Sequence, residues 1–130
     1  MKKFTITVAK TAGFCFGVDR AVKLVYNEIY SGCKAATLGE IIHNPTVVND
    51  LKERGVRVIS SPDEALEGER VVIRSHGAGA DVYRRLEELG IGYSDGTCPF
   101  VRRIQKIAEE CSQKGMTVVI MGDSTHPEVI

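Results

Sequence analysis

Six residues that can bind metals or anions follow strand-like runs of this sequence, at turns or at predicted helix starts. They are two cysteines, three histidines and one glutamate: Cys15, His43, His76, Cys98, His126 and Glu128. Thiolates and imidazoles are ligands for transition metals. Protonated imidazoles also bind anionic groups, and a carboxyl group can deliver a proton. These residue types therefore predict a metal centre, an anion-binding site, or both.

The other two cysteines have a different setting. Cys33 falls in a predicted helix-to-strand loop, and Cys111 falls within a predicted helix. The four cysteines contain no Cys-x-x-Cys pair. Two disulfides would fit the even count, but nothing else indicates secretion, and cytosolic thiols stay reduced. We therefore expect free cysteines, of which only Cys15 and Cys98 are placed as ligands.

The spacing of apolar residues predicts strands that alternate with helices along the chain. Predicted strands cover residues 4–9, 35–38, 56–59, 70–74, 91–94 and 116–121. Predicted helices cover residues 17–30, 45–54, 80–89 and 99–114, and a further short helix is predicted to open with residues 61–64. Proline at helix starts and glycine after helix ends, as at Pro45 and Gly55, support these limits. The predicted fold class is α/β, a parallel sheet flanked by helices.

In a parallel α/β sheet, ligands bind beyond the carboxyl ends of the strands. Each of the six reactive residues follows a predicted strand, so we expect all of them at that edge. Glycines stand beside them, including Gly13 and Gly77, and let the backbone approach a ligand closely. Helix N-termini at the same edge suit an anion such as a diphosphate. Each residue alone could be a core thiol or a turn residue, but together they favour one site.

One short pattern occurs twice. Residues 15–20 and 98–103 both read Cys-x-x-Val-x-Arg, and both copies follow a strand-like stretch and open a helix. They are separated by about the length of one small domain. A true repeat would make residues 15–97 one complete α/β lobe and residues 98–130 the start of a second. A chance echo of six residues is the alternative.

Two kinds of metal centre fit these ligands. Zinc takes cysteine and histidine, but structural zinc sites usually pair ligands within a few residues, which this sequence does not do. A 4Fe–4S cluster takes cysteine sulfurs, normally four, and separate units could each contribute one. The spacing favours the cluster. A zinc- or phosphate-binding α/β module without redox activity is the alternative.

Composition excludes other partners. The chain has 130 residues, 43% of them hydrophobic, with 17 basic and 17 acidic side chains. Without a basic excess, we expect no binding to nucleic acid or to an anionic membrane surface. The apolar runs are far shorter than the ~20 residues that span a bilayer, and the N-terminus does not read as a signal peptide. We therefore expect a cytoplasmic protein.

Five motifs of the sequence resemble those of the 4-hydroxy-3-methylbut-2-enyl diphosphate reductase family, which completes the methylerythritol phosphate pathway of isoprenoid biosynthesis. The motifs cover residues 12–21, 38–45, 74–77, 95–101 and 122–129, in family order. The resemblance implies a three-lobed α/β assembly around a 4Fe–4S cluster. Cys15 and Cys98 would be two of its metal ligands, and the third cysteine would lie outside this chain.

The resemblance also implies roles for the other four residues. His43 and His76 would bind the substrate diphosphate, His126 would line the substrate pocket, and Glu128 would be the catalytic acid. The implied reaction is reductive dehydroxylation of an allylic diphosphate to isopentenyl and dimethylallyl diphosphate. Its electron donor would be a ferredoxin or a flavodoxin. Ala78 departs from the family pattern, which has a branched aliphatic residue there.

Family members are much longer than this chain. We therefore expect the strand within residues 1–14 to pack in a third lobe that this chain lacks, and to be exposed or mispaired here. We also expect the chain alone to be incomplete and inactive.

Overall fold

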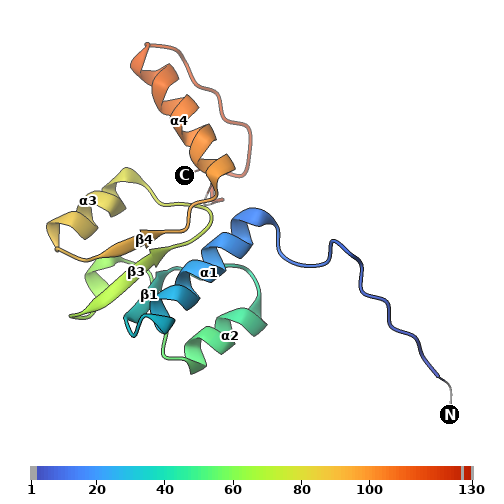
Figure 1. The fold of residues 1–130 in the computed structure, drawn as a ribbon. Helices are drawn as coiled ribbons and strands as arrows, with labels where there is room; N and C mark the ends of the chain where they lie inside the picture. Colours follow the sequence, from blue (N-terminus) through green and yellow to red (C-terminus); the bar gives the residue numbers. More distant parts are fainter. Residues whose placement is uncertain (1–2, 127, 130) are drawn as a thin grey trace.

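The computed structural model of the protein describes residues 3–126 and 128–129 (Figure 1). The helices are α1 (Phe16–Tyr30), α2 (Pro45–Glu53), α3 (Ala80–Glu88) and α4 (Pro99–Gln113), with one 3₁₀ turn, η1 (Pro62–Glu64). The strands are β1 (Lys34–Leu38), β2 (Arg57–Ile59), β3 (Glu69–Ile73) and β4 (Tyr93–Asp95). Each of these elements was predicted, and their ends differ by one or two residues, as helix and strand limits commonly do. No helix in the described part of the chain is long and apolar enough to cross a membrane.

The four strands form one sheet in the order β2-β1-β3-β4, and every pair of neighbours is parallel. The longest pairing joins β1 to β3, from Lys34 opposite Glu69 to Leu38 opposite Ile73. Parallel neighbours need a crossover connection, and helices provide it here. This arrangement confirms the predicted α/β fold.

Helices cover both faces of the sheet (Figure 1). On one face, Val25 of α1 and Leu51 of α2 belong to a buried apolar cluster with Ala35 and Val72 of the strands. On the other face, Leu86 of α3 belongs to a second buried cluster. Its strand residues are Ala36, Leu38, Ile59, Val71 and Ile73. Neighbouring residues of one strand thus enter different clusters, as expected from the two-residue period of a strand.

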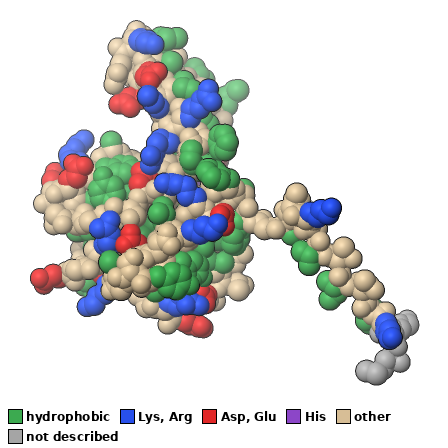
Figure 2. Space-filling model, viewed as in Figure 1, with side chains coloured by type: hydrophobic (Ala, Val, Ile, Leu, Met, Phe, Trp, Pro, Cys, Tyr) green, Lys and Arg blue, Asp and Glu red, His purple; other side chains and the backbone are tan. Residues whose placement is uncertain are grey.

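Helix α4 is packed much less than α1, although both have 15 residues and both begin directly after a cysteine. Helix α1 buries four residues, whereas α4 buries none. Its side chains Phe100, Ile104 and Ile107 are exposed. Helix α4 projects from the body of the molecule, and hydrophobic side chains lie on its surface (Figures 1 and 2). The apolar face of α4 is therefore not covered by any of the residues that the structure describes.

Two predicted strands are absent from the described structure. Residues 4–9 and 116–121 have no regular secondary structure, so these two strand predictions are wrong for this chain. Phe4, Ile6 and Val8 are largely exposed, and so are Val119 and Met121. A strand forms only where its backbone N–H and C=O groups find partners on a neighbouring strand. Neither segment pairs with β2 or β4, the two edges of the sheet.

Substitution of Leu86 tests the second cluster. Leu86 is fully buried, whereas Leu89, just past the end of α3, is 40% exposed. We expect Leu86→Ala to lower the free energy of unfolding by about 2–5 kcal/mol, because it removes packed atoms and leaves a cavity. The matched change Leu89→Ala should cost less than about 1 kcal/mol. Urea denaturation measures both values, and equal losses would contradict the assigned packing.

Candidate functional site

The order in which the chain adds strands to the sheet changes direction between β1 and β3. From β1 the chain moves outward to β2, and it then crosses to β3 on the other side of β1. In open α/β sheets, such a switch point leaves a crevice beyond the carboxyl ends of the strands. His43 lies in the connection after β1, and His76 lies in the connection after β3. Both residues therefore border this crevice.

The three predicted histidines come together there. The ring centroids of His43 and His76 are 5.4 Å apart, and those of His76 and His126 are 5.9 Å apart. His126 belongs to the segment that returns after α4, so it reaches the crevice from a distant part of the sequence. These distances leave the imidazoles close enough to share one multi-oxygen anion.

A hollow of about 280 Å³ lies beside His43 and His76. Its apolar wall is formed by Phe14, Val18 and Ile42, and its polar wall by His43, Asn44, Ser75 and His76. A hollow with one apolar and one polar wall suits a ligand that joins a hydrocarbon part to an ionic group. A larger hollow of about 560 Å³ lies at the amino edge of the sheet, but neither cysteine nor histidine lines it.

The start of α2 faces the same edge. The side-chain oxygen of Asn44 accepts hydrogen bonds from the N–H groups of Thr46 (3.1 Å) and Val47 (3.3 Å). This N-cap begins the helix directly after His43. The N-terminal end of a helix carries partial positive charge, so α2 adds to the attraction for an anion beside His43.

The surroundings of His76 disfavour its protonated form, and a bound anion would favour that form. Burial lowers the pKa of His76 below its ordinary value of 6.5. The charge of Glu128 works against this shift, while Arg74, His43 and His126 add to it. The Nδ1 atom of His76 is buried and has no hydrogen-bond partner among the described residues. A bound anion would supply the missing charge and would raise the pKa of His76.

The turn that carries His126 and Glu128 is held by its own hydrogen bonds. Asp123 accepts from the N–H of Thr125 (2.9 Å) and from its hydroxyl (2.7 Å). The Nδ1 atom of His126 accepts a hydrogen bond from the N–H of Glu128 at 3.2 Å. A neutral imidazole that accepts at Nδ1 carries its proton on Nε2. His126 therefore has Nε2–H available as a donor.

The two predicted cysteine ligands lie at the starts of two helices. Cys15 is the N-cap of α1 and Cys98 is the N-cap of α4, and neither side chain makes a capping hydrogen bond. Both thiols are free. A β-carbon added to Gly17 would lie 2.6 Å from the Sγ atom of Cys98, so Cys98 touches the first turn of α1. The two cysteines therefore lie at neighbouring helix starts.

The remaining cysteines lie elsewhere, as predicted. Cys33 precedes β1 at the opposite edge of the sheet, and Cys111 lies in the last turn of α4. Among residues 3–126 and 128–129, no three side chains of His, Cys, Asp or Glu form a group that could hold a metal ion. This part of the chain thus offers a pair of thiols and not a complete metal site.

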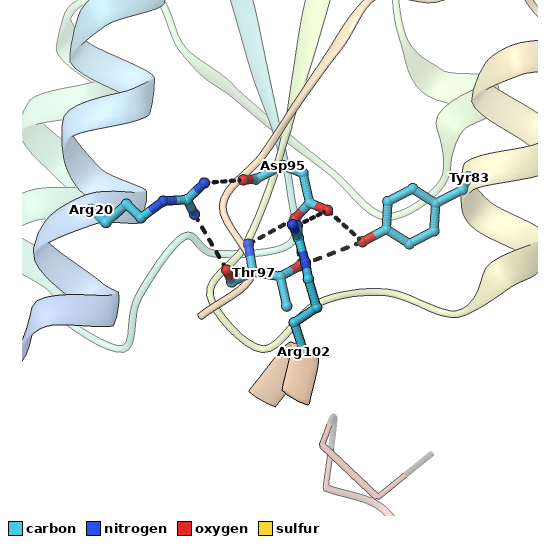
Figure 3. A network of polar contacts seen from close by, with 5 residues as sticks. All are labelled: Arg20, Tyr83, Asp95, Thr97 and Arg102. Atoms are coloured by element: carbon cyan, nitrogen blue, oxygen red, sulfur yellow. Dashed lines mark hydrogen bonds and ion pairs between the residues drawn. The ribbon is translucent and has the colours of Figure 1, made fainter. Parts of the chain in front are cut away.

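A polar network that sequence reasoning missed fixes the loop before Cys98 (Figure 3). The carboxylate of Asp95 accepts hydrogen bonds from the N–H of Thr97 (2.8 Å), the Thr97 hydroxyl and the Tyr83 hydroxyl (3.1 Å). It also pairs with Arg102 of α4. Arg20 of α1 donates to the backbone carbonyls of Thr97 (3.3 Å) and Asp95 (3.1 Å). The network thus joins α1, α3, β4 and α4.

Part of this network had a signal in the sequence. Asp95 precedes Thr97 by two residues, which is the spacing of a turn closed by an aspartate side chain. Arg20 belongs to the repeated Cys-x-x-Val-x-Arg pattern. Tyr83 and Arg102 gave no sequence signal of their part in the network. Burial alone would raise the pKa of Asp95, but the hydrogen bonds from Thr97, the charge of Arg102 and the Tyr83 hydroxyl hold that pKa below its ordinary value.

These features define a class of protein: a parallel α/β protein whose carboxyl edge gathers three imidazoles, a carboxylate and two free thiols. The family can be stated as well. Residues 6–130 match the family described as LytB protein, so the chain belongs to that family.

Curated relatives and solved structures agree with this assignment. The chain is 50% identical over 129 residues to 4-hydroxy-3-methylbut-2-enyl diphosphate reductase of Caldanaerobacter subterraneus subsp. tengcongensis, covering 96% of this chain and 45% of the relative. It is 39% identical to the protein of that name from Clostridioides difficile, again covering 96% and 45%. The chain therefore spans less than half the length of these relatives.

Two solved structures have the same fold. One, described as (E)-4-hydroxy-3-methyl-but-2-enyl diphosphate reductase, the terminal enzyme of the non-mevalonate pathway, matches with a TM-score of 0.82 at 44% identity. The match covers 95% of this chain and 44% of that one. The reductase from Plasmodium falciparum matches with a TM-score of 0.86 at 22% identity, covering 92% and 38%, and supports the fold alone.

Replacement of Asp95 tests the network. Because the folded pKa of Asp95 lies below its ordinary 3.8, the stability that it contributes is present above that pH and is lost as the pH falls through the folded pKa. We expect Asp95→Asn to lower the free energy of unfolding by roughly 1–3 kcal/mol at neutral pH. The difference from the unchanged protein should shrink below a pH of about 4. The control is Glu87→Gln, at an exposed position of α3 beyond its first turn, which should change the free energy of unfolding little at any pH. An effect of Asp95→Asn that stayed constant with pH would contradict the assignment.

NMR titration of the imidazoles tests the environment of His76. We expect His76 to titrate below 6.5 because it is buried. The change Glu128→Gln removes a negative charge that favours the imidazolium, so it should lower the pKa of His76 further. Glu109→Gln, on the exposed surface of α4, should leave that pKa unchanged. A rise in the pKa of His76 in the Glu128→Gln protein would contradict the geometry.

Proposed function

We propose that this chain forms the substrate-facing part of a 4-hydroxy-3-methylbut-2-enyl diphosphate reductase. The observation that carries the proposal is the gathering of His43, His76 and His126 at one sheet edge, beside a hollow with an apolar wall. An allylic diphosphate has both an ionic and a hydrocarbon part. Relatives of that name, at 39–50% identity, support the choice of substrate.

The histidines are proposed to bind the diphosphate. His43 stands next to the N-terminus of α2, and His126 has its Nε2–H free to donate. His76 has a buried nitrogen without a partner among the described residues, which a phosphate oxygen could satisfy. Together with the helix dipole, these groups would neutralise the diphosphate charge.

Cys15 and Cys98 are proposed to be ligands of a 4Fe–4S cluster. Both are free, both stand at helix N-termini, and neither thiol is engaged as a cap. Such a cluster normally takes four cysteine sulfurs, and these two residues fit part of that ligand set. A third cysteine would come from outside this chain, and the iron without a cysteine would be open to the substrate. When bound, the cluster would supply a Lewis-acidic iron and the electrons received from a ferredoxin or a flavodoxin.

Glu128 is proposed to be the acid of the reaction. Hydroxide is a poor leaving group, and the carboxyl proton of Glu128 would allow the allylic hydroxyl to leave as water. Two electrons and a further proton complete the conversion to isopentenyl or dimethylallyl diphosphate. The charge of Glu128 acts on His76, so this carboxyl group lies beside the proposed diphosphate site.

The division of the chain belongs to the same proposal. Residues 15–97 would be one complete lobe, residues 98–130 the start of a second, and residues 1–14 would pack in a third. The exposed side chains Phe100, Ile104 and Ile107 of α4 support this division, because a packed second lobe would cover them. A cytoplasmic location also belongs here, since free thiols persist in that compartment.

Cluster reconstitution tests the function. In full-length protein reconstituted under anaerobic conditions, we expect Mössbauer spectra of one 4Fe–4S cluster and turnover of the allylic diphosphate with reduced ferredoxin. Cys15→Ser and Cys98→Ser should each lose most of the bound iron, because a hydroxyl is a poor substitute for a thiolate ligand. Cys33→Ser and Cys111→Ser are the matched controls and should retain cluster and turnover.

The alternative function predicts a different result in the same experiment. A zinc- or phosphate-binding α/β module without redox activity would hold stoichiometric zinc and no iron after reconstitution, with no turnover. Equal loss of iron from all four cysteine variants would instead reject the ligand assignment.

A further inference from the structure

We propose that Gly17 and Arg20, on one face of α1, are positioning residues that set the separation of the Cys15 and Cys98 thiols. Helix α1 has Cys15 at its start, and the segment of residues 95–98, which runs from the end of β4 to the start of α4, has Cys98 at its end. The two segments touch at three positions on one face of α1: Gly17, Arg20 and Ala21. The inference rests on the proposed function only in naming a 4Fe–4S cluster as the group that the two thiols would share. The relative placement of the thiols is argued from the contacts alone.

The first contact is between Gly17 and Cys98. A β-carbon at Gly17 would lie 2.6 Å from the Sγ atom of Cys98, 3.0 Å from its Cβ atom and 3.7 Å from its Cα atom. Carbon and sulfur atoms that are not bonded do not approach to 2.6 Å. Glycine is a poor helix residue, so its place in the first turn of α1 calls for a reason. Close approach of Cys98 provides it.

The second contact is made by Arg20. Its guanidinium donates one hydrogen bond to the carbonyl of Asp95 (3.1 Å) and one to the carbonyl of Thr97 (3.3 Å), as Figure 3 shows. These carbonyls stand on either side of Gly96, within the loop that ends at Cys98. A planar guanidinium with two engaged N–H groups fixes direction as well as distance. Arg20 therefore holds the backbone of the loop against α1.

The third contact presses the loop between α1 and the sheet. A β-carbon at Gly96 would lie 3.3 Å from the Cβ atom of Ala21 and would overlap the carbonyl oxygen of Ile73. The N–H of Gly96 donates to that same carbonyl at 2.9 Å, and the N–H of Cys98 donates to the carbonyl of Ser75 at 2.9 Å. The loop thus has little freedom to slide along α1.

These contacts involve only residues of this chain. Both thiols therefore belong to one packed unit, and its packing limits how far Cys15 and Cys98 can move relative to each other. Ligands held in advance at the right geometry bind a metal centre more tightly and more selectively than mobile ones. An alanine at position 17 would not need to unfold the protein, because rotation of the Cys98 side chain moves its Sγ atom away and only a small shift is then needed at the 3.0 Å contact with its Cβ atom. It would, however, move the Sγ atom from its place.

Cross-linking of the two thiols in cluster-free, full-length protein tests this inference. Dibromobimane bridges two thiols only when they lie close together, and mass spectrometry of peptides identifies the Cys15–Cys98 link. We expect rapid linking in the unchanged protein and a loss of roughly tenfold in rate for Gly17→Ala, since small displacements strongly reduce effective concentration. Asn27→Ala, on the exposed side of α1, should link at the unchanged rate.

Arg20 gives a second, independent set of variants. Arg20→Ala should slow the link, and Arg20→Lys should restore part of the rate, because one donor replaces two. Circular dichroism and thermal melting establish that each variant is folded. If Gly17→Ala does not fold, the order of the two Arg20 variants decides the question.

Three results would overturn the inference: no Cys15–Cys98 link in the unchanged protein, unchanged linking in folded Gly17→Ala, or equal linking in both Arg20 variants. Reconstitution separates this inference from the proposed function. If no variant and no unchanged protein binds iron, yet linking follows the expected order, the positioning role stands and the function fails. If the unchanged protein binds a cluster, Gly17→Ala should alter the electron paramagnetic resonance spectrum of the reduced cluster, while Asn27→Ala should not.

Discussion

In the sheet, β1 and β3 pair in parallel along their whole length, from Lys34 opposite Glu69 to Leu38 opposite Ile73. Because the last residues of the two strands, Leu38 and Ile73, lie opposite each other, the connections that follow β1 and β3 begin at the same height along the sheet. His43 and His76 are placed side by side in this way, although a helix, two strands and a 3₁₀ turn separate them in the sequence. The same strands also contribute to both apolar clusters. One pairing therefore supports the core and the site together.

A buried carboxylate at the amino edge of the sheet has partners, whereas a buried imidazole nitrogen at the carboxyl edge has none among the described residues. At the amino edge, the buried carboxylate of Glu69 pairs with Arg57 at 2.8 Å and accepts the N–H of Leu66 at 2.8 Å, so its charge is satisfied within the chain. At the carboxyl edge, the imidazole of His76 lies near Arg74 and two further imidazoles as well as the carboxylate of Glu128, and it keeps one buried nitrogen without a partner among the described residues. A net charge of zero for the whole chain hides this contrast. Unsatisfied groups of this kind gather where ligands bind.

The sequence alone predicts the features that depend on local pattern. Apolar period, Pro45 and Gly55 place α2, and the alternation of strands and helices is enough to predict which edge collects the histidines. Periodicity does not reveal whether a strand has a partner, which is why residues 4–9 and 116–121 were assigned wrongly. The contact of Arg20 with Asp95 joins residues 75 positions apart, and it arises only when α1 packs on the sheet.

The contact at Gly17 also limits how the sequence can change over evolutionary time. Every substitution at position 17 adds at least a β-carbon, and that atom meets the Cys98 side chain. Most steric conflicts are relieved by a smaller partner, but a smaller residue at position 98 would lack the thiol. With Cys98 in its proposed role as a cluster ligand, no change at position 98 relieves the contact and also keeps the thiol, so a substitution at position 17 cannot be compensated there. A family that needed a different spacing between these sulfurs would have to move a helix, because it could not do so by exchanging side chains.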